Sequence, residues 1–277
     1  MLSGSDLISF WKLDEFSSLI NDFDEAIGNA IREKDIEQKE DFNHILLHIA
    51  GKSIVSAREI ICLCSNGFAD GAMSLARTVY EHSIILLFFY QRQNDPDFHE
   101  YIEDFFLDYK RKYQKYYKTV AETLNLDELK EQVASSVENR KSKAHHPENG
   151  DYWWSGKGSF FNVIQDVHGY LDDSVKIVFL RAFLLYKQAC LFVHSNSFGN
   201  MWRLSAEGEY EGINTCPSEK GHSLPLEFAA LSIICISFVV CMHLNLEFTA
   251  LQNGFNKLAT YYVTITNERT KQNKSFI

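Results

Sequence analysis

Apolar residues recur at alternating spacings of three and four over residues 44–64, which is the period of an amphipathic helix. Asn66-Gly67 supplies turn residues after it, and Asp70 can cap a second helix over residues 70–90. This second helix is apolar on nearly every side in its C-terminal half, which is typical of a central position. We therefore expect the two segments to form a central hydrophobic hairpin of antiparallel neighbours.

Other helical patterns follow along the chain: a long aromatic helix after Pro96, a polar one over 127–143, a short one from Ser159 to Gly169, an apolar one over 173–194, and one from Pro225 to about Asn253-Gly254. Residues 195–223 show little periodicity and are read as irregular. The patterns predict an all-α bundle of about seven to nine helices. We expect one domain over 1–264, a subdivision near 144–152, and a polar tail over 265–277.

Composition supports a folded helical protein. The chain is 45% apolar and 14% aromatic, and 277 residues contain only four prolines and fourteen glycines. These values exclude a disordered protein and favour long uninterrupted helices. The formal net charge of −10 argues against a surface that binds phosphate backbones throughout, although local basic patches are compatible with it.

The cysteines and the apolar segments indicate a soluble cytoplasmic protein. Most of the six cysteines lie in apolar helical contexts, where a reduced thiol packs as a small hydrophobe, and the N-terminus lacks a secretory signal. Residues 228–246 contain no Asp, Glu, Lys or Arg, but they lack basic or aromatic flanks, so we expect a buried core helix rather than a membrane span. Cys62 and Cys64 would point apart on a helix, and we expect no metal or cofactor.

Two helices place polar residues on apolar faces. Arg77 and Glu81 are spaced i, i+4 on the central helix, and Tyr186, Cys190 and His194 follow one face of the helix over 173–194. Buried polar groups need partners, so the two motifs are expected to meet. Arg77–Glu81 is interpreted either as a structural ion pair or as part of a site, and His194 either as a packing residue or as an acid–base group.

The same residues resemble a large bacterial family of all-helical proteins of unknown function. Residues 72–81 resemble its Ala-x-x-Leu-x-Arg-x-x-x-Glu helix, and Trp154-Ser155-Gly156-Lys157 resembles its Trp-Ser-Gly loop. Tyr186-x-x-x-Cys190-x-x-x-His194-Ser195 is similar to its Tyr-x-x-x-Ser-x-x-x-His helix, with Cys190 in place of serine. The resemblance covers roughly residues 45–250, and it implies that Arg77, Glu81 and His194 converge.

A second resemblance is to the HEPN ribonucleases, helical proteins of bacterial toxin–antitoxin and phage-defence systems with an Arg-x(4–6)-His motif. Arg77 and His82 have this spacing, but Thr78 stands where a residue such as asparagine usually follows the arginine. Alternatively, Arg77 and His194 supply the same two groups, within one chain or across a homodimer interface. RNA cleavage by 2′-hydroxyl attack needs an acid–base group and a cation, and no metal.

Two further segments are candidate binding sites. Residues 109–118 interleave tyrosines with lysines, which suits RNA, although the helical period favours buried tyrosines and solvated lysines. The loop with His145, His146, Trp153 and Trp154 is a candidate for a ligand, and its histidines are expected to lie in solvent rather than on a metal.

Two functions stay open after this. The first is a HEPN-like, metal-independent ribonuclease or toxin, with Arg77, Glu81 and His82 or His194 as catalytic groups. The second is a non-enzymatic helical module that binds a protein partner or a small ligand through the aromatic loop. Ser195, Tyr186 and Lys157 are expected to assist binding in the site.

Overall fold

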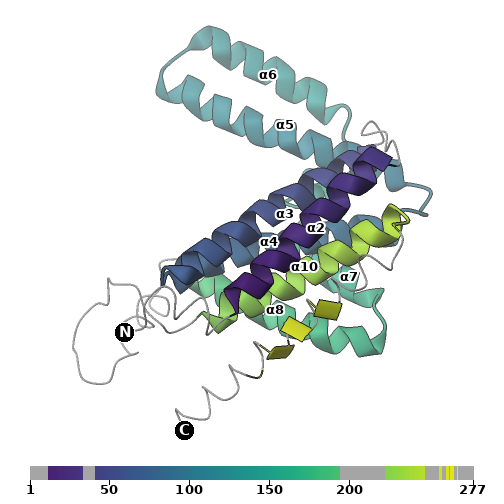
Figure 1. Ribbon diagram of the computed structural model, residues 1–277. Coiled ribbons are helices and arrows are strands. Elements are labelled where there is room, and N and C mark those ends of the chain that lie inside the picture. Colours follow the sequence, from purple (N-terminus) through teal and green to yellow (C-terminus); the bar gives the residue numbers. More distant parts are fainter. Residues whose placement is uncertain are drawn as a thin grey trace. The chain divides into compact units, whose positions relative to one another are not determined.

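The computed structural model describes residues 12–33, 41–193 and 222–246, with a few positions between 256 and 267. These residues form eight α-helices and one short 3-10 helix (Figure 1). Within these ranges the only β-type pairing is a single bridge between Tyr152 and Gly158. The prediction of an all-α fold is therefore confirmed. The irregular segment 195–223 and the tail 265–277 fall almost entirely outside the described residues.

The chain divides into two compact units, one of residues 1–87 and 172–277 and the other of residues 88–171. The first contains α2 (Leu13–Glu33), α3 (Asp41–Ser65), most of α4 (Ala69–Arg92), α8 (Asp173–Val193) and α10 (Ser223–His243). The second contains the last turn of α4, α5 (Phe98–Thr123), α6 (Asp127–Lys141), the 3-10 helix η1 (Trp153–Ser155) and α7 (Phe160–Gly169). The loop at 144–152 lies inside the second unit.

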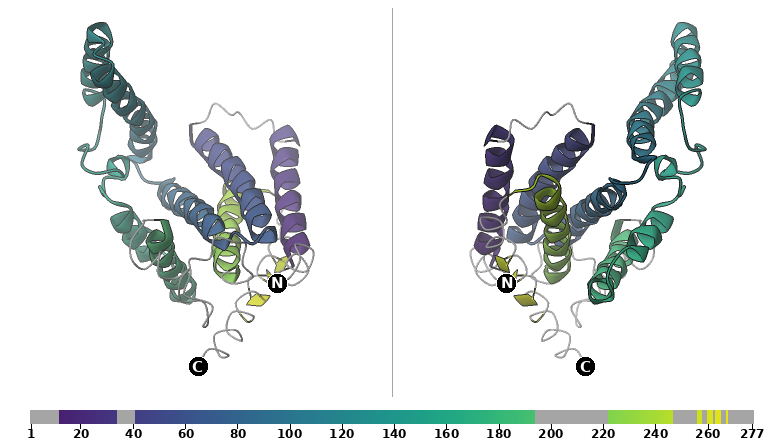
Figure 2. Two further views of the ribbon diagram at one scale, coloured as in Figure 1. Left: turned by 90° about the vertical axis from the view of Figure 1, so that its left-hand side faces the viewer. Right: turned by 90° about the vertical axis from the view of Figure 1, so that its right-hand side faces the viewer.

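In the first unit, α3 packs most closely against α2 and α10, and the three helices are seen together in Figures 1 and 2. The turn to α4 follows the sequence prediction, because Gly67 adopts a positive φ of 81°, which suits glycine. The Tyr80 ring of α4 lies 5.0 Å from Phe228 of α10 and 5.4 Å from Tyr186 of α8. Aromatic packing thus joins α4, α8 and α10 in one core.

Helix α10 is long and apolar enough to cross a membrane on length and composition alone. However, 83% of its most apolar window is buried in the structure, as in a core helix. Glu227 lies inside this helix rather than at its flank, fully buried, with its carboxylate 2.6 Å from Nε of Arg181 on α8. A buried carboxylate requires such a partner, so this ion pair holds α8 against α10.

In the second unit, α5 and α6 form an antiparallel pair (Figure 1). The base of α5 packs on the η1 segment, where Trp154 stacks on Phe89 at 5.3 Å and meets Phe105 edge-on at 5.0 Å. Arg92 at the end of α4 binds Asp166 of α7. The predicted cap of α7 is also present, because Ser159 accepts a hydrogen bond from the Asn162 backbone N–H.

Candidate functional site

The candidate site lies in the first unit and begins with an ion pair on α4. Nε of Arg77 donates to Oε1 of Glu81 at 3.0 Å, and both side chains are about a quarter exposed, at 24% and 23%. The i, i+4 spacing places them on one face of the helix. Partial burial strengthens the interaction relative to a surface pair while leaving the guanidinium within reach of a ligand.

Tyr186 of α8 completes this cluster. Its hydroxyl donates to the same Oε1 of Glu81 at 3.2 Å, and the Arg77 guanidinium lies 5.5 Å from the centre of its ring. Glu81 and Tyr186 are 105 residues apart in the sequence. The structure therefore brings three of the four residues of the predicted cluster together, and Glu81 links the arginine to the second helix.

The electrostatics of this cluster keep Arg77 charged and Tyr186 protonated. Burial acts to lower the pKa of Arg77, but the charge of Glu81, with smaller contributions from Cys190 and Tyr186, raises it overall. Burial, and after it the negative charge of Glu81, raises the pKa of the Tyr186 hydroxyl. The tyrosine is thus a hydrogen-bond donor that fixes Glu81, and the arginine is a permanent cation.

His194 and Ser195 lie outside the described residues. Cys190, one helical turn after Tyr186, is partly buried and close enough to Arg77 to affect its pKa. The Tyr186–Cys190 face of α8 is therefore the face turned towards Arg77. In the sequence, His194 continues the same i, i+4 series directly after the end of α8.

His82 is directed to a different partner. Its Nδ1 lies 2.9 Å from the hydroxyl oxygen of Ser53 on α3, whereas Arg77 faces α8. Positions five residues apart on a helix point about 140° away from each other, which explains the divergence. Burial, followed by the charges of Lys52 and His48, lowers the pKa of His82 to about 4. A neutral histidine bound to Ser53 is poorly suited to act with Arg77 on one phosphate.

This environment predicts a pH dependence of stability. Between pH 6.5 and about 4 the unfolded chain binds a proton at His82 that the folded chain does not. The free energy of unfolding therefore decreases as the pH is lowered through this window. The total loss is about 3 kcal/mol, fully present below pH 4. Denaturant unfolding at several pH values measures it. In the His82→Asn variant, whose amide can still reach Ser53, this part of the slope should disappear; an unchanged slope would assign the effect elsewhere.

The aromatic loop has a structural role in the second unit. Trp153 and Trp154 are buried, at 0% and 2% exposure, and Trp153 Nε1 donates to Asp108 at 2.8 Å. Neither side chain is at the surface to hold a ligand, because both fill the core beside α5. Lys157, the other predicted binding residue of the loop, pairs with Asp166 at 2.7 Å.

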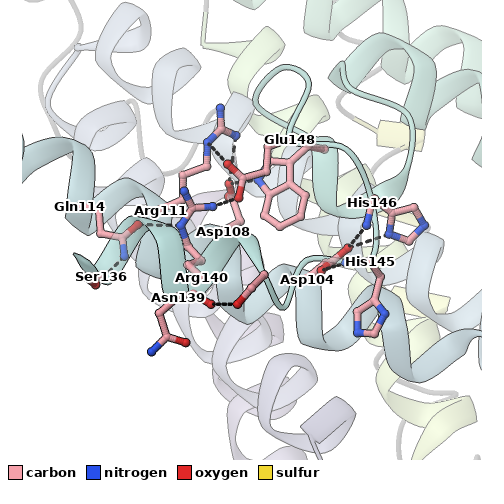
Figure 3. Close-up of polar contacts among 12 residues, drawn as sticks. Asp104, Asp108, Arg111, Gln114, Ser136, Asn139, Arg140, His145, His146 and Glu148 are labelled. Carbon is pink, nitrogen blue, oxygen red and sulfur yellow. Dashed lines mark hydrogen bonds and ion pairs between the residues drawn. The ribbon is translucent and has the colours of Figure 1, made fainter. Parts of the chain in front are cut away.

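Two buried carboxylates of α5 organise the same region, as Figure 3 shows. Asp104 is fully buried and accepts hydrogen bonds from the backbone N–H groups of His145 and His146 and pairs with the His146 ring. Asp108 is buried one turn later, next to Trp153. The sequence analysis missed both residues, although an i, i+4 aspartate pair on the aromatic face of α5 was a usable signal.

An arginine network closes the other end of the loop. Arg140 of α6 binds Glu148 and donates from Nε to Gln114 of α5 at 2.6 Å (Figure 3). Arg111 donates to the carbonyl of Gly150 at 2.8 Å. Carboxylates, arginines and backbone groups therefore hold the segment between α6 and η1 against α5, so the loop is rigidly anchored rather than a free flap.

The fold and the site define the class of protein: an all-α chain in which an arginine–glutamate pair on one core helix is hydrogen-bonded to a tyrosine on another. The chain belongs to a family of unknown function, DUF5677, which matches residues 43–211. The three motifs of the predicted helical family fall inside this match, so that prediction is confirmed. No curated protein and no solved structure matches the chain. These comparisons give no support to the HEPN resemblance, which rests on the sequence motif alone.

Proposed function

We propose that this protein is a metal-independent endoribonuclease that uses Arg77 to bind the reacting phosphate. The observation that carries the proposal is the Tyr186–Glu81 hydrogen bond, which joins Arg77 of α4 to the polar face of α8. Glu81 engages Nε of Arg77, and a guanidinium held in this way still presents its terminal amino groups. Two planar N–H donors and a fixed positive charge suit a phosphate oxygen.

The assigned chemistry is transfer of the phosphate within the RNA chain. The ribose 2′-oxygen forms a bond to the adjacent phosphorus, the bond from phosphorus to the 5′-oxygen breaks, and the products are a 2′,3′-cyclic phosphate and a 5′-hydroxyl. His194 accepts the 2′-hydroxyl proton, and the leaving 5′-oxygen takes a proton from water. Arg77 stabilises the charge that develops on the phosphorane, and Glu81 and Tyr186 position Arg77. His82 is left out because it is bound to Ser53.

The resemblance to HEPN proteins implies a cytoplasmic role in bacterial defence or in a toxin–antitoxin system. The competing function is a non-enzymatic helical module in which Arg77, Glu81 and Tyr186 are only a structural clamp between α4 and α8. The burial of Trp153 and Trp154 weakens the version of it that used the aromatic loop as a binding surface.

Induced expression in a bacterial host separates the two functions. We expect the wild-type chain to arrest growth and His194→Ala to relieve the arrest, because loss of an acid–base group lowers a rate by about 10²–10⁴-fold. His44→Ala, at an exposed histidine of α3, is the matched control and should arrest growth like the wild type. Immunoblots confirm equal protein levels. Growth without arrest, or arrest that His194→Ala leaves intact, would favour the non-enzymatic module.

A further inference from the structure

The tyrosines of α5 are not where the helical period predicts them. Residues 109–117 were expected to bury their tyrosines in a core, but four of them are exposed: Tyr109 at 63%, Tyr113 at 49%, Tyr116 at 64% and Tyr117 at 42%. The prediction was wrong because α6, the helix that packs along α5, leaves these four side chains largely uncovered. Several large aromatic side chains exposed on consecutive turns are a feature of binding surfaces.

Three of these tyrosines form a continuous strip. The rings of Tyr109 and Tyr113 are 5.2 Å apart, and those of Tyr113 and Tyr117 are 5.7 Å apart. The i, i+4, i+8 spacing places all three on one line along the helix. Such a strip presents aromatic faces and edges in series, and successive bases of a single strand can stack on such a series.

The strip forms one wall of a groove between α5 and α6. The groove has a volume of about 650 Å³, and the other wall consists of polar and small apolar residues of α6. Its thirteen lining residues include three cations, Lys110, Arg140 and Lys143, and no aspartate or glutamate. In a chain with a net charge of −10, a groove lined by cations and without carboxylates favours an anion over a cation.

The cations of this groove differ in their availability. Arg140 is buried and is held by Glu148 and Gln114, so it fixes the floor of the groove. Lys110 and Lys143 are exposed, and neither has an ion-pair partner within the described second unit. By contrast, Lys112, two residues further along α5, pairs with Asp108 at 2.6 Å. Two free ammonium groups beside the tyrosine strip suit a chain of phosphates.

We infer that the α5–α6 groove binds single-stranded RNA, with bases stacked on Tyr109, Tyr113 and Tyr117 and phosphates held by Lys110 and Lys143. The side-chain amides of Gln132 and Asn139 on the α6 wall can bond base edges or 2′-hydroxyls. Duplex RNA is a poorer ligand, because its bases are not free to stack on the tyrosines. The choice of RNA over DNA rests on the proposed function, whereas the affinity for a single strand rests on the groove alone.

Fluorescence anisotropy with a labelled single-stranded 12-nucleotide RNA tests this inference on the full chain. The His194→Ala background prevents cleavage of the probe during the titration. Lys110→Gln/Lys143→Gln should weaken binding about 25-fold at 0.1 M salt and lower the slope of log K against log salt by about 1.4. The matched control is Lys115→Gln/Lys118→Gln, which makes the same charge change on α5 outside the groove and should change binding less than about twofold.

A second matched pair tests the stacking. Tyr113→Ala should weaken RNA binding roughly tenfold or more, whereas Tyr116→Ala, more exposed but outside the groove, should leave it nearly unchanged. Circular dichroism verifies that each variant is folded. Equal losses of RNA affinity in the two lysine double variants, or in the two tyrosine variants, would contradict the assignment of the groove as the RNA-binding site. So would a wild-type Kd above about 100 μM, which is no tighter than non-specific binding.

The same titrations with DNA of identical sequence and with duplex RNA test the choice of ligand. We expect both to bind more weakly than the single-stranded RNA, and tighter binding of DNA would overturn the assignment to RNA. The outcome is independent of the ribonuclease proposal. RNA binding without growth arrest would support the groove as an RNA-binding site and refute the proposed ribonuclease function. Growth arrest that His194→Ala relieves, without groove-dependent binding, would support the proposed function and refute the RNA-binding groove.

Discussion

Replacement of Asp104 by alanine is expected to lower the free energy of unfolding by about 3–5 kcal/mol. The carboxylate is fully buried and accepts hydrogen bonds from two consecutive backbone N–H groups, those of His145 and His146, as well as pairing with the His146 ring. Its removal takes away the acceptor that these groups share at a fully buried position, and each unsatisfied group costs about 1–3 kcal/mol. Denaturant unfolding followed by tryptophan fluorescence, to which Trp153 and Trp154 contribute, measures the loss.

Two further variants make the interpretation specific. Asp104→Asn keeps the shape and one acceptor but points an amide N–H at another donor, so an intermediate loss is expected. Glu103→Gln, at the exposed neighbour that bonds the His145 ring at 2.8 Å, should change stability by less than about 1 kcal/mol. If Asp104→Ala were no more destabilising than Glu103→Gln, the loop after α6 would not depend on this carboxylate.

Local signals were enough to predict most of the helices. Ser159 is followed by an apolar periodic segment, and it caps α7 as expected. Gly67 ends the α3 region with a positive φ, also as expected. The end of α10 was placed near residue 253, but the helix stops at His243 and Asn245 has a φ of 47°. Asparagine is a common left-handed residue after a helix, and Leu246 concealed this stop by continuing the apolar pattern.

Tertiary neighbours could not be predicted in the same way. The pattern of α5 defines an aromatic face along the whole helix, but only packing decides how far another element covers it. Trp154 covers the first half at Phe105, and the second half carries the exposed tyrosines 109–117. Likewise, α3 was expected to pair with α4 from their short connection; Ser53 and His82 do join these two helices, but α3 packs most closely against α2 and α10. A helical period by itself does not say which distant element covers a given face.

The candidate site was partly accessible from the sequence, because buried polar groups must find partners. This requirement placed Arg77 and Glu81 near Tyr186, and the structure has the Tyr186–Glu81 hydrogen bond. It did not indicate the partner of His82, because Ser53 on α3 has no distinctive spacing relative to α4. It also gave no weight to Asp104, since aspartates on a helix usually lie in solvent.

Arg77→Ala is expected to reduce the rate of RNA cleavage by about 10²–10³-fold, the usual effect of removing one donor that stabilises the transition state. Tyr186→Phe keeps the ring beside Arg77 but removes the hydroxyl that fixes Glu81, so a smaller loss of about tenfold is expected. Arg77→Lys retains the charge but not the planar pair of donors and should fall between the wild type and Arg77→Ala.

Cleavage of a labelled single-stranded RNA by the purified full chain, with a chelator present, is the most direct measurement of the proposed site. The matched control is Arg58→Ala, at an exposed arginine of α3 whose partner Asp24 is also exposed. We predict chelator-resistant cleavage by the wild type and Arg58→Ala, products with a 2′,3′-cyclic phosphate, and the stated loss for Arg77→Ala. Absence of cleavage by the wild type, or an Arg77→Ala rate equal to that of Arg58→Ala, would contradict the assignment of Arg77 as the phosphate-binding group.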